Sequence, residues 1–136
     1  MSHPNQFNAL TQLRLSPFFE RTSKLNESQE WRRWSGYLSA TNYELTHDNE
    51  YFAIRTKAAL LDISPLHKYI IQGPDSQIFL DRLVTRNIKI CKVGQVMYTP
   101  WCDENGKVID DGTVQRLSND KYRITSAEPN LDWLKH

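Results

Sequence analysis

Two adjacent carboxylates, Asp110 and Asp111, stand in an otherwise apolar or small stretch that reads as a β-strand, GKVIDDGTV. Neighbouring residues of a strand point to opposite faces, so one acid is expected toward solvent and the other toward the core or a cleft. Apolar neighbours raise the pKa of an unpaired buried carboxylate, which prepares it to act as an acid or a base. Gly112 adds no side chain beside the pair, which lets a ligand or another backbone approach closely.

The chemistry of the residues alone also supports a structural interpretation of this acidic pair, and favours it over a catalytic one. In that interpretation the pair lies at a bulge or a hairpin edge, where the acids are solvated or pair with Arg116 or Lys107. Asn105 and Gly106, just before the pair, form the strongest short hairpin signal in the chain.

Other chemical motifs find no support in the sequence. His47 and His67 neighbour no serine or cysteine in a nucleophile motif, which argues against a catalytic triad. No HExxH, GxxxxGK(S/T) or GxGxxG occurs, which argues against zinc hydrolysis, a P-loop and a dinucleotide-binding turn. Cys91 and Cys102 belong to no CxxC or Cys/His cluster, so we expect two reduced thiols in a cytoplasmic protein and no bound metal.

Length and charge bound the class of protein. The 136 residues suit one ordinary domain or a large piece of a bigger protein, and 17 Lys+Arg against 16 Asp+Glu give a net charge of +1. This balance lacks the basic excess of nucleic-acid-binding proteins and offers no polybasic membrane anchor. No apolar run approaches the roughly 20 residues of a membrane span. We therefore expect neither a nucleic acid nor a membrane as a partner.

Helices and strands that mix without strict alternation are expected to position the acidic pair. A helix is predicted over 46–64, with a buried stripe of Tyr51, Ile54, Ala58 and Leu61. Two more helices are predicted, at 128–136 and at 74–85, the second with Ile78, Phe79 and Leu83 facing inward. Strands are predicted at 67–73, 93–103, 108–117 and 122–127, the last with Tyr122, Ile124 and Ser126 on one face. This order predicts an α+β fold, an antiparallel sheet with helices packed on one side.

Residues 1–45 are predicted to form a polar, partly helical N-terminal segment, and residues 46–136 the α+β domain. Ser16 and Pro17 are typical of a helix start and predict a short helix over 16–25. Gly36 interrupts the aromatic stretch WRRWSGYL, so we expect a turn that leads into an extended piece. The arginines beside these rings are interpreted as a packed edge in which arginine stems cover the rings, rather than as a ligand stack.

Two long blocks carry a resemblance to a known family. The blocks AIRTKAALLDISPLHKYIIQGPDSQIFLDRLVTRNI and VGQVMYTPWCDENGKVIDDGTVQRL resemble the glycine cleavage T-protein family, the folate-dependent aminomethyltransferases. The family has a helix ending in AGLFD(V/I)S, a strand reaching GPDA, a helix FLDRLLT and the motif ENGG(V/I)(I/V)DD. Several ordered blocks match at the family's spacing, over about Tyr43 to His136. The resemblance implies the N-terminal portion of the aminomethyltransferase folate-binding fold, with tetrahydrofolate as the cofactor.

The resemblance also implies roles for three residues. Asp111 matches the second aspartate of the family's DD, which faces the folate and is its catalytic acid. Its expected place is near N10 of the folate, where it steers proton transfer as the one-carbon unit moves to N5. Tyr98 matches a tyrosine that lines the folate pocket, and Leu66 falls where T-proteins carry a methionine against the pterin. These roles lead us to expect Asp111 to face a ligand-sized hollow and Asp110 to face outward.

Departures from the family pattern leave the substrate open. SP in place of SH, and DDGT in place of DDL, bring the chain closer to relatives that demethylate sulfonium or methoxyaromatic compounds and pass the methyl group to tetrahydrofolate. A tetrahydrofolate-dependent demethylase of a methylated small molecule is therefore one alternative to an aminomethyltransferase. A non-catalytic folate-binding module is another.

The enzymes of this family are considerably longer than this chain. The resemblance therefore implies a domain truncated at its C-terminus, either a fragment or one half of a split enzyme with a separate C-terminal subunit. Activity is then expected to need the missing part, because a lone piece buries less of the ligand. The implied partners are folate and either a small-molecule one-carbon donor or a lipoylated carrier protein.

Overall fold

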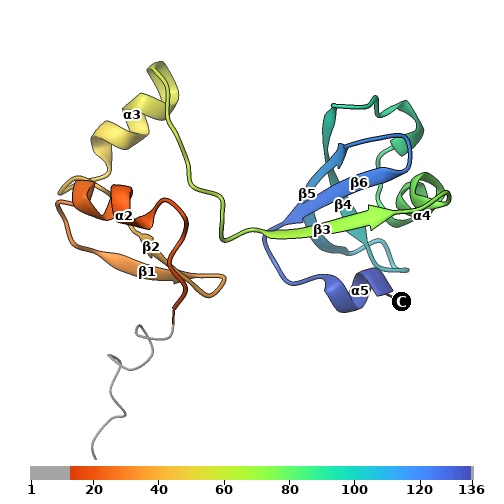
Figure 1. Cartoon of the computed structure of the whole chain (residues 1–136), viewed down its shortest axis with the longest axis horizontal. Helices are drawn as coiled ribbons and strands as arrows, with labels where there is room; N and C mark the ends of the chain where they lie inside the picture. Colours follow the sequence, from red (N-terminus) through yellow and green to blue (C-terminus); the bar gives the residue numbers. More distant parts are fainter. Residues whose placement is uncertain (1–12, 136) are drawn as a thin grey trace, which may run out of the picture. The chain divides into compact units, whose positions relative to one another are not determined.

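The computed structural model describes residues 13–135, and the chain divides into two compact units between Pro65 and Leu66. Figure 1 colours the described part of the first unit from red to yellow-green and the second from green to blue. The division does not coincide with the predicted boundary at 45/46, because the helix that follows residue 46 belongs to the first unit.

The first unit combines short helices with a two-stranded hairpin. Its elements are α2 (Phe19–Thr22), the 3-10 helix η1 (Ser23–Leu25), β1 (Trp31–Trp34), β2 (Tyr37–Ala40) and α3 (Asp48–Thr56). The helix predicted over 16–25 is therefore present as α2 and η1. The backbone N–H of Phe18 donates to Ser16 Oγ at 3.2 Å, but the N-cap residue of α2 is Phe18, so the helix begins two residues later than predicted.

The aromatic stretch of the first unit forms a hairpin rather than a turn followed by a single extended piece. Strands β1 and β2 pair antiparallel, and Ser35 and Gly36 make the turn with φ of +46° and +81°. Positive φ at both positions is typical of a two-residue hairpin turn, for which glycine is well suited. The Arg32 guanidinium lies 5.8 Å from the Trp34 ring centroid, and that of Arg14 lies 4.3 Å from the Tyr37 ring centroid. In both contacts the guanidinium group lies over a ring of the hairpin.

Helix α3 is shorter and more exposed than predicted. It ends at Thr56, and Lys57 leaves the helical region with φ −132° and ψ −119°. The predicted buried stripe is wrong, since Tyr51 is 53% exposed, Ile54 68% and Leu61 72%. Helical periodicity predicts which residues share a face, whereas burial also needs another element to cover that face.

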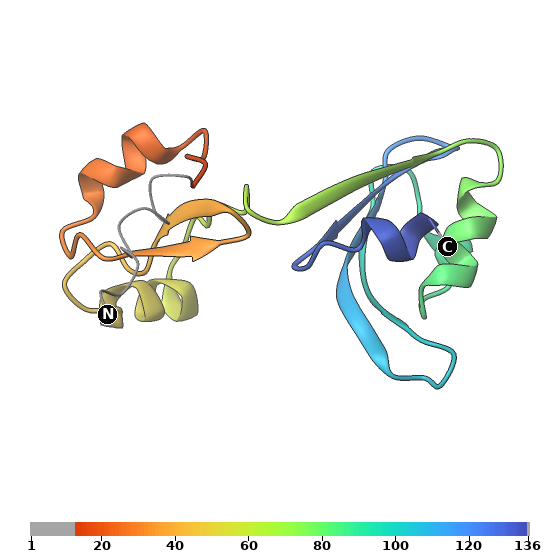
Figure 2. The ribbon, with the colours of Figure 1, turned by 90° about the horizontal axis from the view of Figure 1, so that it is seen from below.

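The second unit is a four-stranded antiparallel sheet with helices, and the predicted α+β fold class is confirmed. Its elements are β3 (His67–Gln72), α4 (Ser76–Leu83), the 3-10 helix η2 (Ile88–Ile90), β4 (Val96–Cys102), β5 (Val108–Arg116), β6 (Lys121–Ser126) and α5 (Leu131–Lys135). All four strands predicted for this part are present, in the spatial order β3-β6-β5-β4. Figure 1 and Figure 2 show these strands with α4 and α5 beside them.

The core of the second unit lies on one face of this sheet. It joins residues from α4, η2 and α5 with strand residues, namely Leu80, Val84, Ile88, Trp101, Val114, Tyr122, Ile124 and Leu134. The prediction that Tyr122, Ile124 and Ser126 share a buried face is confirmed.

The orientation predicted for the helix at 74–85 is partly wrong. Ile78 is 57% exposed and Phe79 37%, while Leu80 is fully buried. The buried positions Ser76 and Leu80 are one helical turn apart, and the Ser76 hydroxyl donates to the Asp120 carbonyl oxygen at 2.9 Å. With Ser76 and Leu80 on the buried face of α4, Ile78 and Phe79 point away from the core.

Within residues 13–135, no helix is both long enough and apolar enough to cross a membrane.

Candidate functional site

The two acids of the DD pair lie on opposite faces of β5, in the reverse of the predicted orientation. Asp110 is 8% exposed and shares the core face with Val114. Asp111 is exposed and lies on the other face, which none of the core residues covers. The expectation that Asp111 faces inward and Asp110 outward is therefore wrong. The two acids do face opposite sides, as strand alternation predicts. Val114 is buried, and every second residue of a strand lies on the same face, so Asp110 lies on the face of Val114.

Asp110 forms a buried hydrogen-bonded cluster with the segment that connects β6 to α5. Its Oδ1 accepts from the Asp111 backbone N–H at 2.8 Å. Its Oδ2 accepts from Asn130 Nδ2 at 2.6 Å and from the Glu128 backbone N–H at 3.2 Å. The side chain of Arg116, expected as a partner in the structural interpretation, instead donates to backbone carbonyl oxygens of Cys91, Ser118 and Asn119.

Asp111 is paired with Tyr98 on the open face of the sheet. The register of β4 and β5 places Pro100 opposite Asp111 and Tyr98 opposite Thr113, so Tyr98 and Asp111 are diagonal neighbours on one face. The hydrogen bond to the Asp111 carboxylate raises the pKa of the Tyr98 phenol above its usual value of 10.0, with burial as a smaller cause. Two of the three predicted site residues therefore come together in the structure.

Leu66, the third predicted site residue, lies apart from this pair. It is half-buried in the bend that precedes β3, and its carbonyl oxygen accepts from Lys68 Nζ at 2.8 Å. In the sheet order β3-β6-β5-β4, strand β6 separates β3 from β5. At about 4.8 Å per strand, roughly 10 Å separates β3 from the strand that carries Asp111.

Gly112 permits the close approach of another backbone, one of the two roles that its position suggested. A Cβ added to Gly112 would lie 2.0 Å from the Thr125 carbonyl oxygen and 3.3 Å from the Ser126 Cα on β6. Strands β5 and β6 therefore meet closely beside the DD pair, and a side chain at residue 112 has no room.

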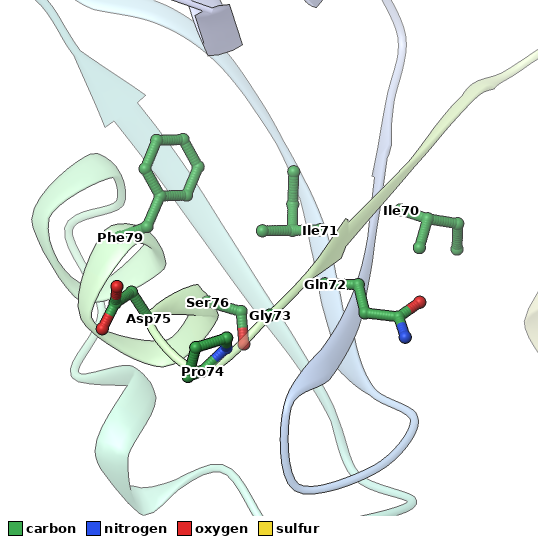
Figure 3. Close-up of a pocket in the computed structure, with 8 residues that line it drawn as sticks. All are labelled: Ile70, Ile71, Gln72, Gly73, Pro74, Asp75, Ser76 and Phe79. Carbon is green, nitrogen blue, oxygen red and sulfur yellow. The ribbon is translucent and has the colours of Figure 1, made fainter.

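Two cavities among residues 13–135 are described here, and neither is lined by a predicted site residue. One, of about 490 Å³, lies in the second unit at the end of β3 and the start of α4 (Figure 3) and is lined by Ile70, Ile71, Gln72, Gly73, Pro74, Asp75, Ser76 and Phe79. The other, of about 300 Å³, lies in the first unit and is lined by Phe18, Thr22, Leu25, Tyr43, Leu60, Leu61 and Asp62. In the part of the chain that the structure describes, no three His, Cys, Asp or Glu side chains gather as metal ligands. Asp111 therefore contributes to a surface and not to one of these hollows.

The Tyr98–Asp111 hydrogen bond predicts a pH-dependent contribution to stability. Because the folded state raises the Tyr98 pKa above 10.0, the contribution is complete below pH 10 and is lost as the pH rises through the folded-state value. The difference in urea midpoint between the wild type and Tyr98→Phe is expected to be constant between neutral pH and pH 10. Above pH 10 this difference should shrink. A difference that stays constant in strong alkali contradicts this expectation, since the other tyrosines titrate in both proteins.

Two kinds of comparison relate this chain to known proteins. It is 30% identical to an aminomethyltransferase of Halothermothrix orenii over 128 residues, which are 90% of this chain and 35% of that protein. It is 44% identical to a trimethylamine-oxide aldolase of Ruegeria pomeroyi over 87 residues, 63% of this chain and 11% of that protein. Its fold resembles the crystal structure of glycine cleavage system aminomethyltransferase T from Bartonella henselae, with a TM-score of 0.74, 23% identity and coverage of 89% of this chain and 33% of that one.

The chain spans only about a third of the length of the aminomethyltransferases that it matches. A family model described as the GCVT N-terminal domain matches residues 18–136. Since that match covers most of the sequence, the chain belongs to this family and corresponds to the N-terminal part of the glycine cleavage T-protein.

Proposed function

We propose that this chain provides the acid-bearing part of a tetrahydrofolate-dependent one-carbon transferase of the aminomethyltransferase type. One observation carries the proposal: Asp111 and Tyr98 are diagonal neighbours on one open sheet face, in a chain of this family. Asp111 is also the residue whose position matches the family's catalytic aspartate.

The chemistry of this pair fits folate. A carboxylate accepts hydrogen bonds from N–H groups of a ligand, and it can hold or release a proton at its own oxygen. Tetrahydrofolate, when bound, supplies the nitrogen atoms that carry the one-carbon unit. Tyr98 is a diagonal neighbour of Asp111, and its interaction with the carboxylate raises the pKa of the phenol. Pro100, opposite Asp111 on β4, adds an apolar surface beside the pair.

The open face provides one wall of a site. Small-molecule sites normally bury most of their ligand, whereas Asp111 is exposed and Tyr98 is 57% exposed. A further polypeptide segment is therefore needed to enclose the folate and to bind the one-carbon donor, whether it continues this chain or is a separate subunit. In this proposal Leu66 contacts the pterin at the β3 side of the face, and a lipoylated carrier protein is the partner that delivers the one-carbon unit.

A second candidate donor is a methylated amine. The identity to the trimethylamine-oxide aldolase is 44% over 87 residues, against 35% over 89 residues for an aminomethyltransferase of Bacillus cereus. A one-carbon donor of this class keeps the same role for Asp111 and needs no lipoylated carrier. Turnover of a methylated amine by the assembled enzyme, without any carrier protein, would favour this candidate over the first.

Titration of the ¹⁵N-labelled chain with tetrahydrofolate tests the folate-binding role. Because only one wall is present, we expect weak binding, with a dissociation constant on the order of 1 mM. The amide signals that move should be those of the open face, namely Tyr98, Asp111 and Thr113. Asp111→Asn should reduce these shifts, while Glu104→Gln, which removes an exposed charge in the β4–β5 turn, should leave them unchanged.

Two results would contradict the folate-binding role. One is a folded chain whose spectrum does not change at ligand concentrations well above the expected dissociation constant. The other is a set of shifts confined to the cavity between β3 and α4 (Figure 3), because that hollow contains none of the proposed folate contacts.

A further inference from the structure

The backbone of Asp111 lies where the regular pairing of the sheet stops. Pairing between β5 and β6 begins only at Gly112, so Asp111 is outside that register. On the other side Asp111 lies opposite Pro100, whose carbonyl oxygen accepts from the Thr85 N–H at 3.1 Å and so faces away from β5. A register shift follows at once, between Trp101 and Cys102 on β4. The sheet alone therefore holds this residue less firmly than it holds the residues further along β5.

The side chain of Asp110 provides a hydrogen bond to the Asp111 backbone where β6 offers no paired residue. Its Oδ1 accepts from the Asp111 N–H at 2.8 Å, while its Oδ2 binds Asn130 and the Glu128 backbone. Asn130 is in turn fixed by two other strands, because its backbone N–H donates to the Tyr69 hydroxyl at 2.8 Å and its Nδ2 lies 3.3 Å from Ser126 Oγ. A single buried carboxylate thus ties the backbone of Asp111 to β3, β6 and the start of α5.

We propose that Asp110 is a positioning residue, whose buried carboxylate fixes the Asp111 backbone and thereby holds the Asp111 side chain beside Tyr98 on the opposite face. The inference rests on the proposed function only in that it treats Asp111 as the functional acid. It assigns different tasks to the two members of the DD pair: the first anchors and the second contacts the ligand. Each of the recorded partners of Asp110 is an N–H donor, which suits an acceptor-only carboxylate.

The pairing of Asp111 with Tyr98 provides a readout that a purely structural role of Asp110 would not move. The titration midpoint of Tyr98 can be followed by ¹³C NMR of tyrosine-labelled chain, with the signal assigned through Tyr98→Phe. Asp111→Asn gives the midpoint without the carboxylate. In Asp110→Ala we expect the Tyr98 midpoint to fall at least halfway from the wild-type value to that of Asp111→Asn.

Asn130→Ala is the matched control for loss of stability. This variant removes the 2.6 Å contact to Asp110 Oδ2 but leaves the bond from the Asp111 N–H to Oδ1 in place. It should lower the urea midpoint, as Asp110→Ala does, and keep the wild-type Tyr98 midpoint. A folded Asp110→Ala variant with the wild-type Tyr98 midpoint would overturn the proposal, as would an equal fall of the midpoint in both variants.

A measurement on the wild-type chain covers the case in which Asp110→Ala does not fold. The Asp111 amide proton should exchange slowly with solvent although the residue is exposed, because the Asp110 carboxylate is its acceptor. Exchange as fast as that of an unprotected, exposed amide overturns the proposal. Neither experiment uses folate, so the positioning role and the proposed function can fail separately.

Discussion

Gly112→Ala is expected to destabilise the second unit severely, by about 3 kcal/mol or more, at the upper end of the costs of overpacking. The added Cβ would lie 2.0 Å from the Thr125 carbonyl oxygen, and a backbone atom cannot rotate out of the way as a side-chain end can. Strands β5 and β6 must separate, which disturbs the register that joins Gly112 to Ser126. Thermal unfolding followed by circular dichroism should show a midpoint lower by roughly 12 °C or more, at ~4 °C or more per kcal/mol for a domain of this size.

Gly106→Asn is the matched control for this variant. Gly106 lies in the β4–β5 turn with φ +77° and open space around its Cα, so only the backbone conformation restricts it. Asparagine tolerates positive φ better than other non-glycine residues, and we expect a loss of no more than about 1 kcal/mol. If Gly112→Ala is as stable as Gly106→Asn, then β5 and β6 do not approach each other as closely as described.

The sequence predicted the order of elements in the second unit because each strand there is bounded by clear turn signals. Gly73 and Pro74 separate β3 from α4, and Asn105–Gly106 separates β4 from β5. What could not be read from the sequence is the phase of β5. Alternation requires that the two acids of the DD pair face opposite sides, but it does not say which acid faces the core.

Tertiary contacts decide that phase. Val114 packs in the core, and Asn130, 20 positions away in the sequence, supplies the donor that makes a buried Asp110 acceptable. The sequence of β5 by itself does not predict a partner so far away in the chain. For this reason Asp111 stays a proposed ligand contact that rests on resemblance to the family, while the predicted direction of its side chain is wrong.

The first unit was predicted less well for a related reason. Its predicted helical stripe was judged by periodicity alone, yet α3 has no buried residue and Leu60 after it is 96% exposed. For β1 and β2, the sequence predicted the turn at Gly36 and the strand after it. It did not predict the strand before the turn, because Trp31 and Trp34 also fit a helical spacing. Short apolar segments are ambiguous between helix and strand until their partners are known.

The proposed transferase role predicts a large effect of Asp111→Asn on turnover. A chimera in which this chain replaces the aligned N-terminal third of the Halothermothrix aminomethyltransferase would supply the missing walls of the site. In that protein Asp111→Asn is expected to lower kcat by about 10² to 10⁴, the range typical of losing a positioned acid or base. Tetrahydrofolate affinity should change only a few-fold, because the amide keeps the size and most of the hydrogen-bonding capacity of the carboxylate.

Two control variants test whether the loss of kcat is specific to the Asp111 carboxylate. Glu104→Gln removes a carboxylate from the exposed turn between β4 and β5 and should keep full turnover. Tyr98→Phe removes only the hydroxyl that pairs with Asp111, so its loss of kcat should be smaller than that of Asp111→Asn. Undiminished turnover in a folded Asp111→Asn chimera would remove Asp111 from the mechanism. A loss of folate affinity at unchanged kcat would instead limit its role to binding, because an interaction that is equally strong in the ground state and the transition state contributes to affinity and not to kcat.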